Sequence, residues 1–190
     1  MIQLHCQTRQ AWLDCVLKDF NGFLLDHAAN ERKASSMAMS LVAHYPDRSE
    51  LTLAMIDLAL EELNHFRQVV RLMQERNLIM PADEKDPYVN QLRSHARADP
   101  DAYFMDRLLS AAVIEARGEE RFRLLAGALT EPRLKTFYET LAKSEQGHHE
   151  LFVHLARQYF PHDTVKSRLQ EWLAIEQTVI EQLPVHGKLH

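Results

Sequence analysis

The chain has 190 residues, which favours a single domain with a sizeable core. A hydrophobic fraction of 46% and a charged fraction of 26% exclude a disordered chain, and five glycines are few for the turns of an all-β fold. The formal net charge of −5 does not point to a nucleic-acid partner. Two cysteines cannot form a disulfide scaffold and suit a reducing, cytoplasmic location. We see neither a signal peptide nor an apolar run of membrane-spanning length.

Prolines divide the chain into helix-length segments, because proline breaks a helix interior. We expect a short helix at about 9–18, followed by long helices at about 20–45, 48–78, 101–129 and 133–160 and a C-terminal helix at about 164–183. Helix-start signals agree with these ranges. Asp47 with Glu50 fits a capping box, and Asp99 precedes a proline at the first helical position.

The connections between these segments predict the topology. Most of them are only a few residues long and make antiparallel hairpins, whereas the link from about 79 to 99 has roughly 20 residues. A helix of about 30 residues is about 45 Å long, and about 20 extended residues can run that length. We therefore expect an all-α, ferritin-like four-helix bundle with one long crossover and an extra C-terminal helix, within a single domain over residues 1–190.

Each of the four long helices carries an apolar stripe that a carboxylate interrupts. In two of them the interruption is a Glu-x-x-His motif, formed by Glu62 with His65 and by Glu145 with His148. This spacing puts both side chains on one helix face, one turn apart, where both can bind a metal cluster. In a chain this rich in Glu and His, chance supplies about one such match, so the motif alone is weak evidence.

The register of the motifs is stronger evidence. Glu31 precedes Glu62 by 31 residues, Glu115 precedes Glu145 by 30, and 83 or 84 residues separate the corresponding positions of the two halves. A lone Glu or His on such a stripe is most often a boundary or satisfied core residue, but six in register do not fit that explanation. The predicted metal ligands are Glu31, Glu62, His65, Glu115, Glu145 and His148.

Four buried carboxylates need positive charge nearby, and two divalent ions would supply it. Four carboxylates and two imidazoles are typical of a di-iron or di-manganese site, and the oxygen-rich set favours two iron ions over zinc. A di-iron site can use dioxygen as co-substrate to hydroxylate a C–H bond, with two electrons from an external donor protein. It can also oxidise Fe(II) for storage, as in a bacterioferritin-like ferroxidase. An oxygenase acting on a small molecule, and a helical interaction protein with a vestigial metal site, are further alternatives.

Residues beside the predicted ligands carry less information. Glu119 lies one turn after Glu115 and is a candidate further ligand, proton donor or surface residue. His27 lies one turn before Glu31 and is a candidate to support that ligand. His149 lies off the ligand positions, where a solvated or satisfied role is expected.

Four segments of the sequence resemble the MiaE-type tRNA hydroxylases. They are LDHA with ERKA (25–34), EELNHF (61–66), IEAR with ERF (114–122) and SEQGH (144–148), and the resemblance extends from about Thr8 to the last helix. It implies a nonhaem di-iron monooxygenase that hydroxylates the isopentenyl group of 2-methylthio-N-isopentenyladenosine in tRNA. It also implies the same six metal ligands, with no departure in the ligand set.

A tRNA substrate requires basic side chains that contact phosphate. Two i,i+4 pairs lie near the level of the predicted ligands and are the candidate substrate contacts. They are Arg67 with Arg71 and Arg117 with Arg121. The alternative for each is a solvated arginine beside an acidic partner such as Glu120 or Glu75.

Overall fold

The computed structural model describes residues 2–190, and within them the chain forms seven helices and no strand. This confirms the predicted all-α class. The helices correspond closely to the segments that the prolines delimit. They are α1 (Gln10–Lys18), α2 (Phe20–His44), α3 (Ser49–Glu75), α4 (Pro87–Ser94), α5 (Pro100–Ala128), α6 (Pro132–Tyr159) and α7 (His162–Gln182).

Proline and aspartate mark the starts of α4 and α5. Each helix begins with proline, where the missing N–H is not needed, and the preceding aspartate caps the first turn. The Asp86 carboxylate accepts from the backbone N–H of Tyr88 at 2.8 Å, and that of Asp99 accepts from Ala102 at 3.0 Å. The capping box predicted at the start of α3 is wrong, because Arg48 occupies the N-cap position and makes no side-chain cap hydrogen bond.

The chain divides into two compact units. The α2–α3 unit comprises Asp14–Glu84 and His186–Leu189. The α5–α6 unit comprises the chain up to Leu13, Lys85–Val185 and His190. The assignment of all 190 residues to a single domain stays a prediction.

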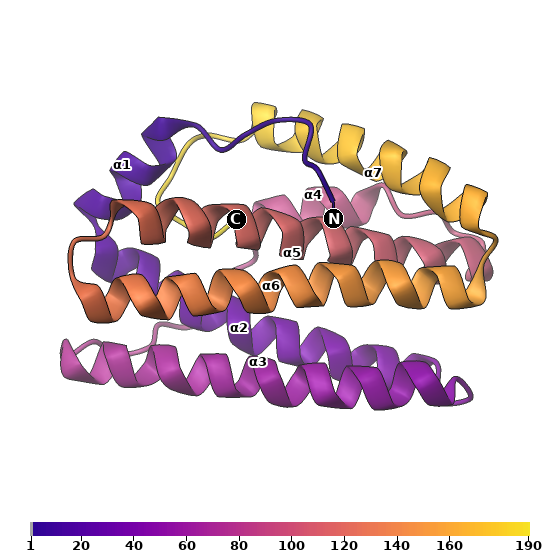
Figure 1. Cartoon of the computed structure of the whole chain (residues 1–190), viewed down its shortest axis with the longest axis horizontal. Helices are drawn as coiled ribbons and strands as arrows, with labels where there is room; N and C mark the ends of the chain where they lie inside the picture. The colour runs from indigo at the N-terminus through magenta and orange to yellow at the C-terminus, as the bar shows by residue number, and fades with distance from the viewer. Residues whose placement is uncertain (1) are drawn as a thin grey trace. The chain divides into compact units, whose positions relative to one another are not determined.

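In the α2–α3 unit the two long helices pack side by side as an antiparallel hairpin (Figure 1). The hairpin carries large apolar side chains that are fully buried, among them Phe23, Leu41 and Met55. A polar link lies within it, since the Ser35 hydroxyl donates to the carbonyl oxygen of Ala59 at 2.9 Å. Burial of the apolar side chains supplies most of the stabilisation of such a hairpin.

In the α5–α6 unit the second antiparallel hairpin is joined by α7 and by the short α4, which lies in the crossover (Figure 1). Asp106 on α5 is fully buried and is the centre of a hydrogen-bond network in this unit. Its carboxylate accepts hydrogen bonds from Arg97, from Arg168 and from the Trp172 indole, the last at 3.1 Å. Burial alone would raise the pKa of Asp106, but these hydrogen bonds lower it.

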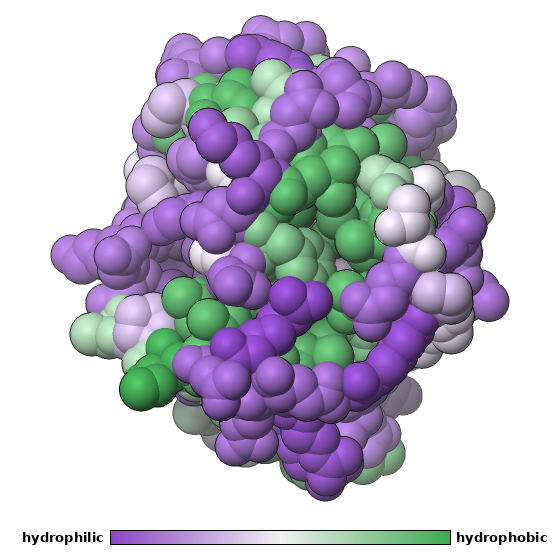
Figure 2. Space-filling model, turned by 90° about the vertical axis from the view of Figure 1, so that its left-hand side faces the viewer, coloured by the Kyte–Doolittle hydropathy of each residue, from purple (hydrophilic) through white to green (hydrophobic). Residues whose placement is uncertain are grey.

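The face drawn in Figure 2 is mostly hydrophilic, with hydrophobic residues exposed between the polar ones. Across residues 2–190, no helix combines the length and apolar character that crossing a membrane requires.

Candidate metal centre

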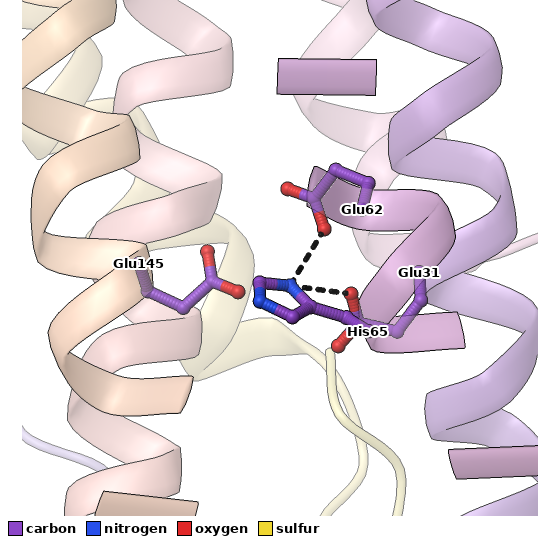
Figure 3. A group of neighbouring side chains, drawn as sticks. All are labelled: Glu31, Glu62, His65 and Glu145. Atoms are coloured by element: carbon purple, nitrogen blue, oxygen red, sulfur yellow. Dashed lines mark hydrogen bonds and ion pairs between the residues drawn. The ribbon is translucent and has the colours of Figure 1, made fainter. Parts of the chain in front are cut away.

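Three predicted ligands come together in the α2–α3 unit. Glu62 and His65 lie one turn apart on α3, and the hairpin places Glu31 of α2 beside them. One ligand atom from each residue lies within 4.8 Å of the others. His65 Nδ1 is 3.3 Å from Glu62 Oε2 and 3.6 Å from Glu31 Oε2, as the dashed lines in Figure 3 mark. All three side chains are buried.

The electrostatics of this cluster favour ionised carboxylates. Burial alone would raise the pKa of Glu31, but hydrogen bonds with His27, His65 and Glu62 lower it well below its ordinary value. Burial alone would lower the pKa of His65, but its hydrogen bonds with Glu31 and Glu62 raise it to about 10. Without a metal, the His65 proton therefore supplies the positive charge that the buried carboxylates require.

His27 makes a short contact with Glu31. Its Nε2 is 2.5 Å from Glu31 Oε1, one turn along α2, and the ring is fully buried. The ring of Phe23 packs against it at a centroid distance of 5.7 Å. His27 therefore bonds a predicted ligand, as the sequence suggested.

The other three predicted ligands come together in the α5–α6 unit. Glu145 and His148 lie one turn apart on α6, and Glu115 of α5 lies beside them. One ligand atom from each residue lies within 4.8 Å of the others. His148 Nδ1 is 3.3 Å from Glu145 Oε2, the same separation as in the other motif. These side chains are buried as well.

Glu119 makes a separate link between α5 and α6. Its Oε2 is 2.8 Å from Nε2 of His149, and its other oxygen bonds Arg123. His149 is fully buried, so of the two roles expected from the sequence the solvated one is wrong; its Nε2 has a partner in Glu119, whereas its buried Nδ1 has no hydrogen-bond partner among the described residues. Nothing in the local sequence indicated this pairing, because the two residues are 30 positions apart.

The four candidate substrate arginines separate into two classes. Arg67 and Arg71 are exposed on α3, and Arg67 donates to the Asn64 side chain at 2.5 Å. The prediction of a basic surface patch at Arg117 and Arg121 is not met, because both side chains are buried.

Arg117 is fully buried and forms a bidentate ion pair with a carboxylate that local sequence does not reveal. Its Nε donates to Glu176 Oε1 at 2.8 Å, and its Nη2 donates to Glu176 Oε2 at 3.0 Å. It also donates to the carbonyl oxygen of Cys6 and bonds Glu120. The guanidinium of Arg121 lies 5.0 Å from the ring centroid of Trp12. These contacts tie α5 to α7 and to the N-terminal segment.

The chemistry of the donors fits a di-metal cofactor. Each unit offers two buried carboxylates and one imidazole within bonding reach of one another. Hard oxygen donors with one histidine suit iron or manganese, whereas structural zinc sites use cysteine or more histidine. Paired carboxylates away from water need compensating positive charge, which a divalent ion provides.

Comparisons of sequence agree with this chemistry. Residues 1–190 match the family described as tRNA-(MS[2]IO[6]A)-hydroxylase (MiaE). The chain is 40% identical over 156 residues to a tRNA 2-(methylsulfanyl)-N(6)-isopentenyladenosine(37) hydroxylase of Pseudomonas putida, covering 82% of this chain and 76% of the relative. It is 29% identical over 226 residues to the protein of the same name from Salmonella typhimurium, covering 93% and 83%.

Comparison of structures gives the fold. A solved Synechococcus protein, described as protein 43 with aldehyde deformylating oxygenase activity, matches with a TM-score of 0.94 and 30% identity. The match covers 100% of this chain and 96% of that protein, which confirms the predicted ferritin-like class. With its full-length family match and its 40% identical relative, the chain belongs to the MiaE family of tRNA hydroxylases.

Proposed function

We propose that this protein is a nonhaem di-iron monooxygenase that hydroxylates the isopentenyl group of 2-methylthio-N-isopentenyladenosine in tRNA. The observation that carries the proposal is the buried Glu/His cluster in each half of a chain that belongs to this hydroxylase family over its whole length. Curated relatives from two bacteria carry the name of this tRNA hydroxylase. A tRNA substrate fits a cytoplasmic protein.

The proposed cofactor is a pair of iron ions. The proposed ligands are the six buried residues Glu31, Glu62, His65, Glu115, Glu145 and His148. The repeat of Glu plus Glu-x-x-His supports this assignment, because it gives two ions equivalent sets of donors. When bound, the iron pair supplies the reaction with dioxygen, and an external donor protein supplies two electrons.

The residues of the centre prepare it for metal in three ways. Burial keeps water away from the carboxylates, which strengthens every electrostatic interaction among them. The lowered pKa of Glu31 keeps that ligand ionised near neutral pH. His65 carries a proton in the absence of metal and must lose it to coordinate, so metal takes over the charge that the proton supplied.

Substrate contacts are proposed at Arg67 and Arg71 on the exposed face of α3. Charged arginines bind the phosphates of an RNA backbone, and their contribution weakens as salt concentration rises. Arg117 and Arg121 are not proposed as contacts, because they are buried.

A second function is suggested by the solved Synechococcus protein, whose name describes activity on an aldehyde. An oxygenase acting on a small apolar molecule would use the same metal ligands but would not need an arginine surface.

Analysis of tRNA from a deletion strain separates the two functions. Nucleosides from the strain, from the strain complemented with the wild-type gene and from the strain complemented with Glu115→Ala are quantified by mass spectrometry. We expect the hydroxylated nucleoside to disappear on deletion, return with the wild-type gene and stay absent with the variant. Undiminished hydroxylated nucleoside in the deletion strain refutes the proposed function.

A further inference from the structure

The two halves of the proposed metal centre differ at one buried position. The repeat of 84 residues that relates Glu31 to Glu115 also relates His27 to Ala111. His27 bonds the Glu31 carboxylate at 2.5 Å, whereas the methyl group of Ala111 has no hydrogen to donate to a carboxylate. The α2–α3 unit therefore has a support for its first ligand that the corresponding position of the α5–α6 unit cannot supply.

The hydrogen bond from His27 fixes which oxygen of Glu31 is available to bind a metal ion. An ionised carboxylate only accepts hydrogen bonds, so His27 must donate through Nε2 to Oε1. The other oxygen, Oε2, lies 3.6 Å from Nδ1 of His65, the second ligand type in this cluster. The bond thus leaves Oε2 directed toward the side of the carboxylate where the other donors lie.

The surroundings hold His27 in place. The ring is fully buried and packs against Phe23, which is also fully buried. One turn beyond Glu31, Ser35 donates to the carbonyl oxygen of Ala59 and ties α2 to α3. Glu31 therefore lies between two anchored residues of α2, His27 and Ser35, and its carboxylate has little freedom to turn.

We propose that His27 is a positioning residue that orients Glu31 for metal binding. Glu31 is a proposed ligand of one metal position only, so removing His27 weakens that position and leaves the other unchanged. Loss of an outer partner of this kind typically costs about 10–100-fold in metal affinity. The inference rests on the proposed di-metal centre.

The test is an anaerobic titration of the metal-free full-length protein with Co(II), followed by its visible absorption. We expect the wild type to bind two equivalents. We expect His27→Ala to bind one equivalent with unchanged affinity and the second about 10–100-fold more weakly. His27→Gln, whose amide reaches the place of Nε2, should restore the second equivalent, and His27→Asn, whose amide is too short, should not.

His149→Ala is the matched control. It removes the other fully buried histidine that bonds a glutamate through Nε2, but Glu119 is not a proposed ligand. We expect this variant to bind two equivalents as the wild type does. Thermal unfolding of each metal-free variant shows whether it folds. If His27→Ala does not fold, the comparison of His27→Gln with His27→Asn tests the role of His27.

The outcomes are distinguishable. Two equivalents of unchanged affinity in His27→Ala or His27→Asn refute the role of His27 and leave the proposed function intact. Equal weakening of both equivalents, or the same loss in His149→Ala, also refutes it, because the effect would then be general. A wild-type protein that binds no metal overturns the proposed centre and this inference together.

Discussion

Replacing Glu176 with glutamine tests whether Arg117 is a structural residue or a tRNA contact. Both side chains are fully buried, and the guanidinium donates to both oxygens of the carboxylate, at 2.8 and 3.0 Å. Tyr88 adds a hydrogen bond to the same carboxylate at 3.3 Å. Glutamine keeps the shape of the side chain but removes the negative charge that compensates Arg117.

The expected loss of stability in Glu176→Gln is large because the positive charge of Arg117 stays buried. Breaking one side of a buried ion pair typically costs about 3–5 kcal/mol. The bond from Arg117 to the partly buried Glu120 survives the change, so the lower end of that range is expected. At about 2–4 °C per kcal/mol for a protein of this size, the Tm should fall by roughly 6–12 °C.

The assay is urea and thermal unfolding of the metal-free protein, combined with a double-mutant cycle. Arg117→Met should also destabilise the protein. The double variant should lose less unfolding free energy than the two single variants lose together, because it buries no unpaired charge. The KM for tRNA should remain unchanged in Glu176→Gln. A Tm within 1–2 °C of the wild type (roughly 0.5 kcal/mol), or a raised KM at unchanged stability, would contradict the structural role of Arg117.

Four further predictions follow. Glu115→Gln should bind fewer than the two iron ions per chain expected of the wild type, which metal analysis after anaerobic loading will show; full occupancy would remove Glu115 from the ligand set. In the metal-free protein, hydrogen bonds with buried carboxylates raise the pKa of His65 from 6.5 to about 10. Protonated His65 therefore stabilises the folded protein fully below about pH 6.5, and this stabilisation is lost as the pH rises towards 10. The urea midpoint should fall over that interval in the wild type and much less in His65→Ala. Reversing the charge of exposed Arg67 and Arg71 should raise the KM for tRNA and flatten its salt dependence while leaving the Tm within about 2 °C, and an unchanged KM would exclude this face. Asp106→Asn should destabilise the protein by about 3 kcal/mol in urea unfolding, because the fully buried carboxylate accepts hydrogen bonds from two arginines and an indole; a loss below about 1 kcal/mol would mean that the site relaxes around the change.

Sequence predicted the helices well because their boundaries are encoded locally. Proline at the first helical position and aspartate before it act within a few residues, as at Asp99 and Pro100. The capping box at Asp47 and Glu50 was a wrong prediction of the same local kind, since the chain starts α3 without a side-chain cap.

The composition of each Glu/His cluster was also predictable. The pitch of a helix fixes the Glu-x-x-His pair on one face, and a short loop fixes which part of the neighbouring helix lies opposite. The structure accordingly brings Glu31 to Glu62 and His65 within one unit, and Glu115 to Glu145 and His148 within the other.

The roles of the arginines could not be predicted, because they depend on partners far along the chain. An i,i+4 pair such as Arg117 and Arg121 looks like a surface patch unless the packing of α7 is known. Glu176 lies 59 residues beyond Arg117, and no local pattern indicates that it faces α5. The pairing of Glu119 with His149 escaped prediction for the same reason.

The central claim is the proposed reaction, in which the six buried Glu and His residues would hold iron, and one oxygen atom of dioxygen would enter the isopentenyl group of a modified adenosine in tRNA. The most direct measurement incubates the iron-loaded protein with tRNA bearing the 2-methylthio-N-isopentenyladenosine nucleoside, a chemical reductant and ¹⁸O₂, and then analyses the nucleosides by mass spectrometry. We predict a hydroxylated nucleoside that carries one ¹⁸O atom, and none with His148→Ala. A nucleoside that stays unmodified with the fully iron-loaded protein, or a hydroxyl group whose oxygen comes from water, would contradict the account.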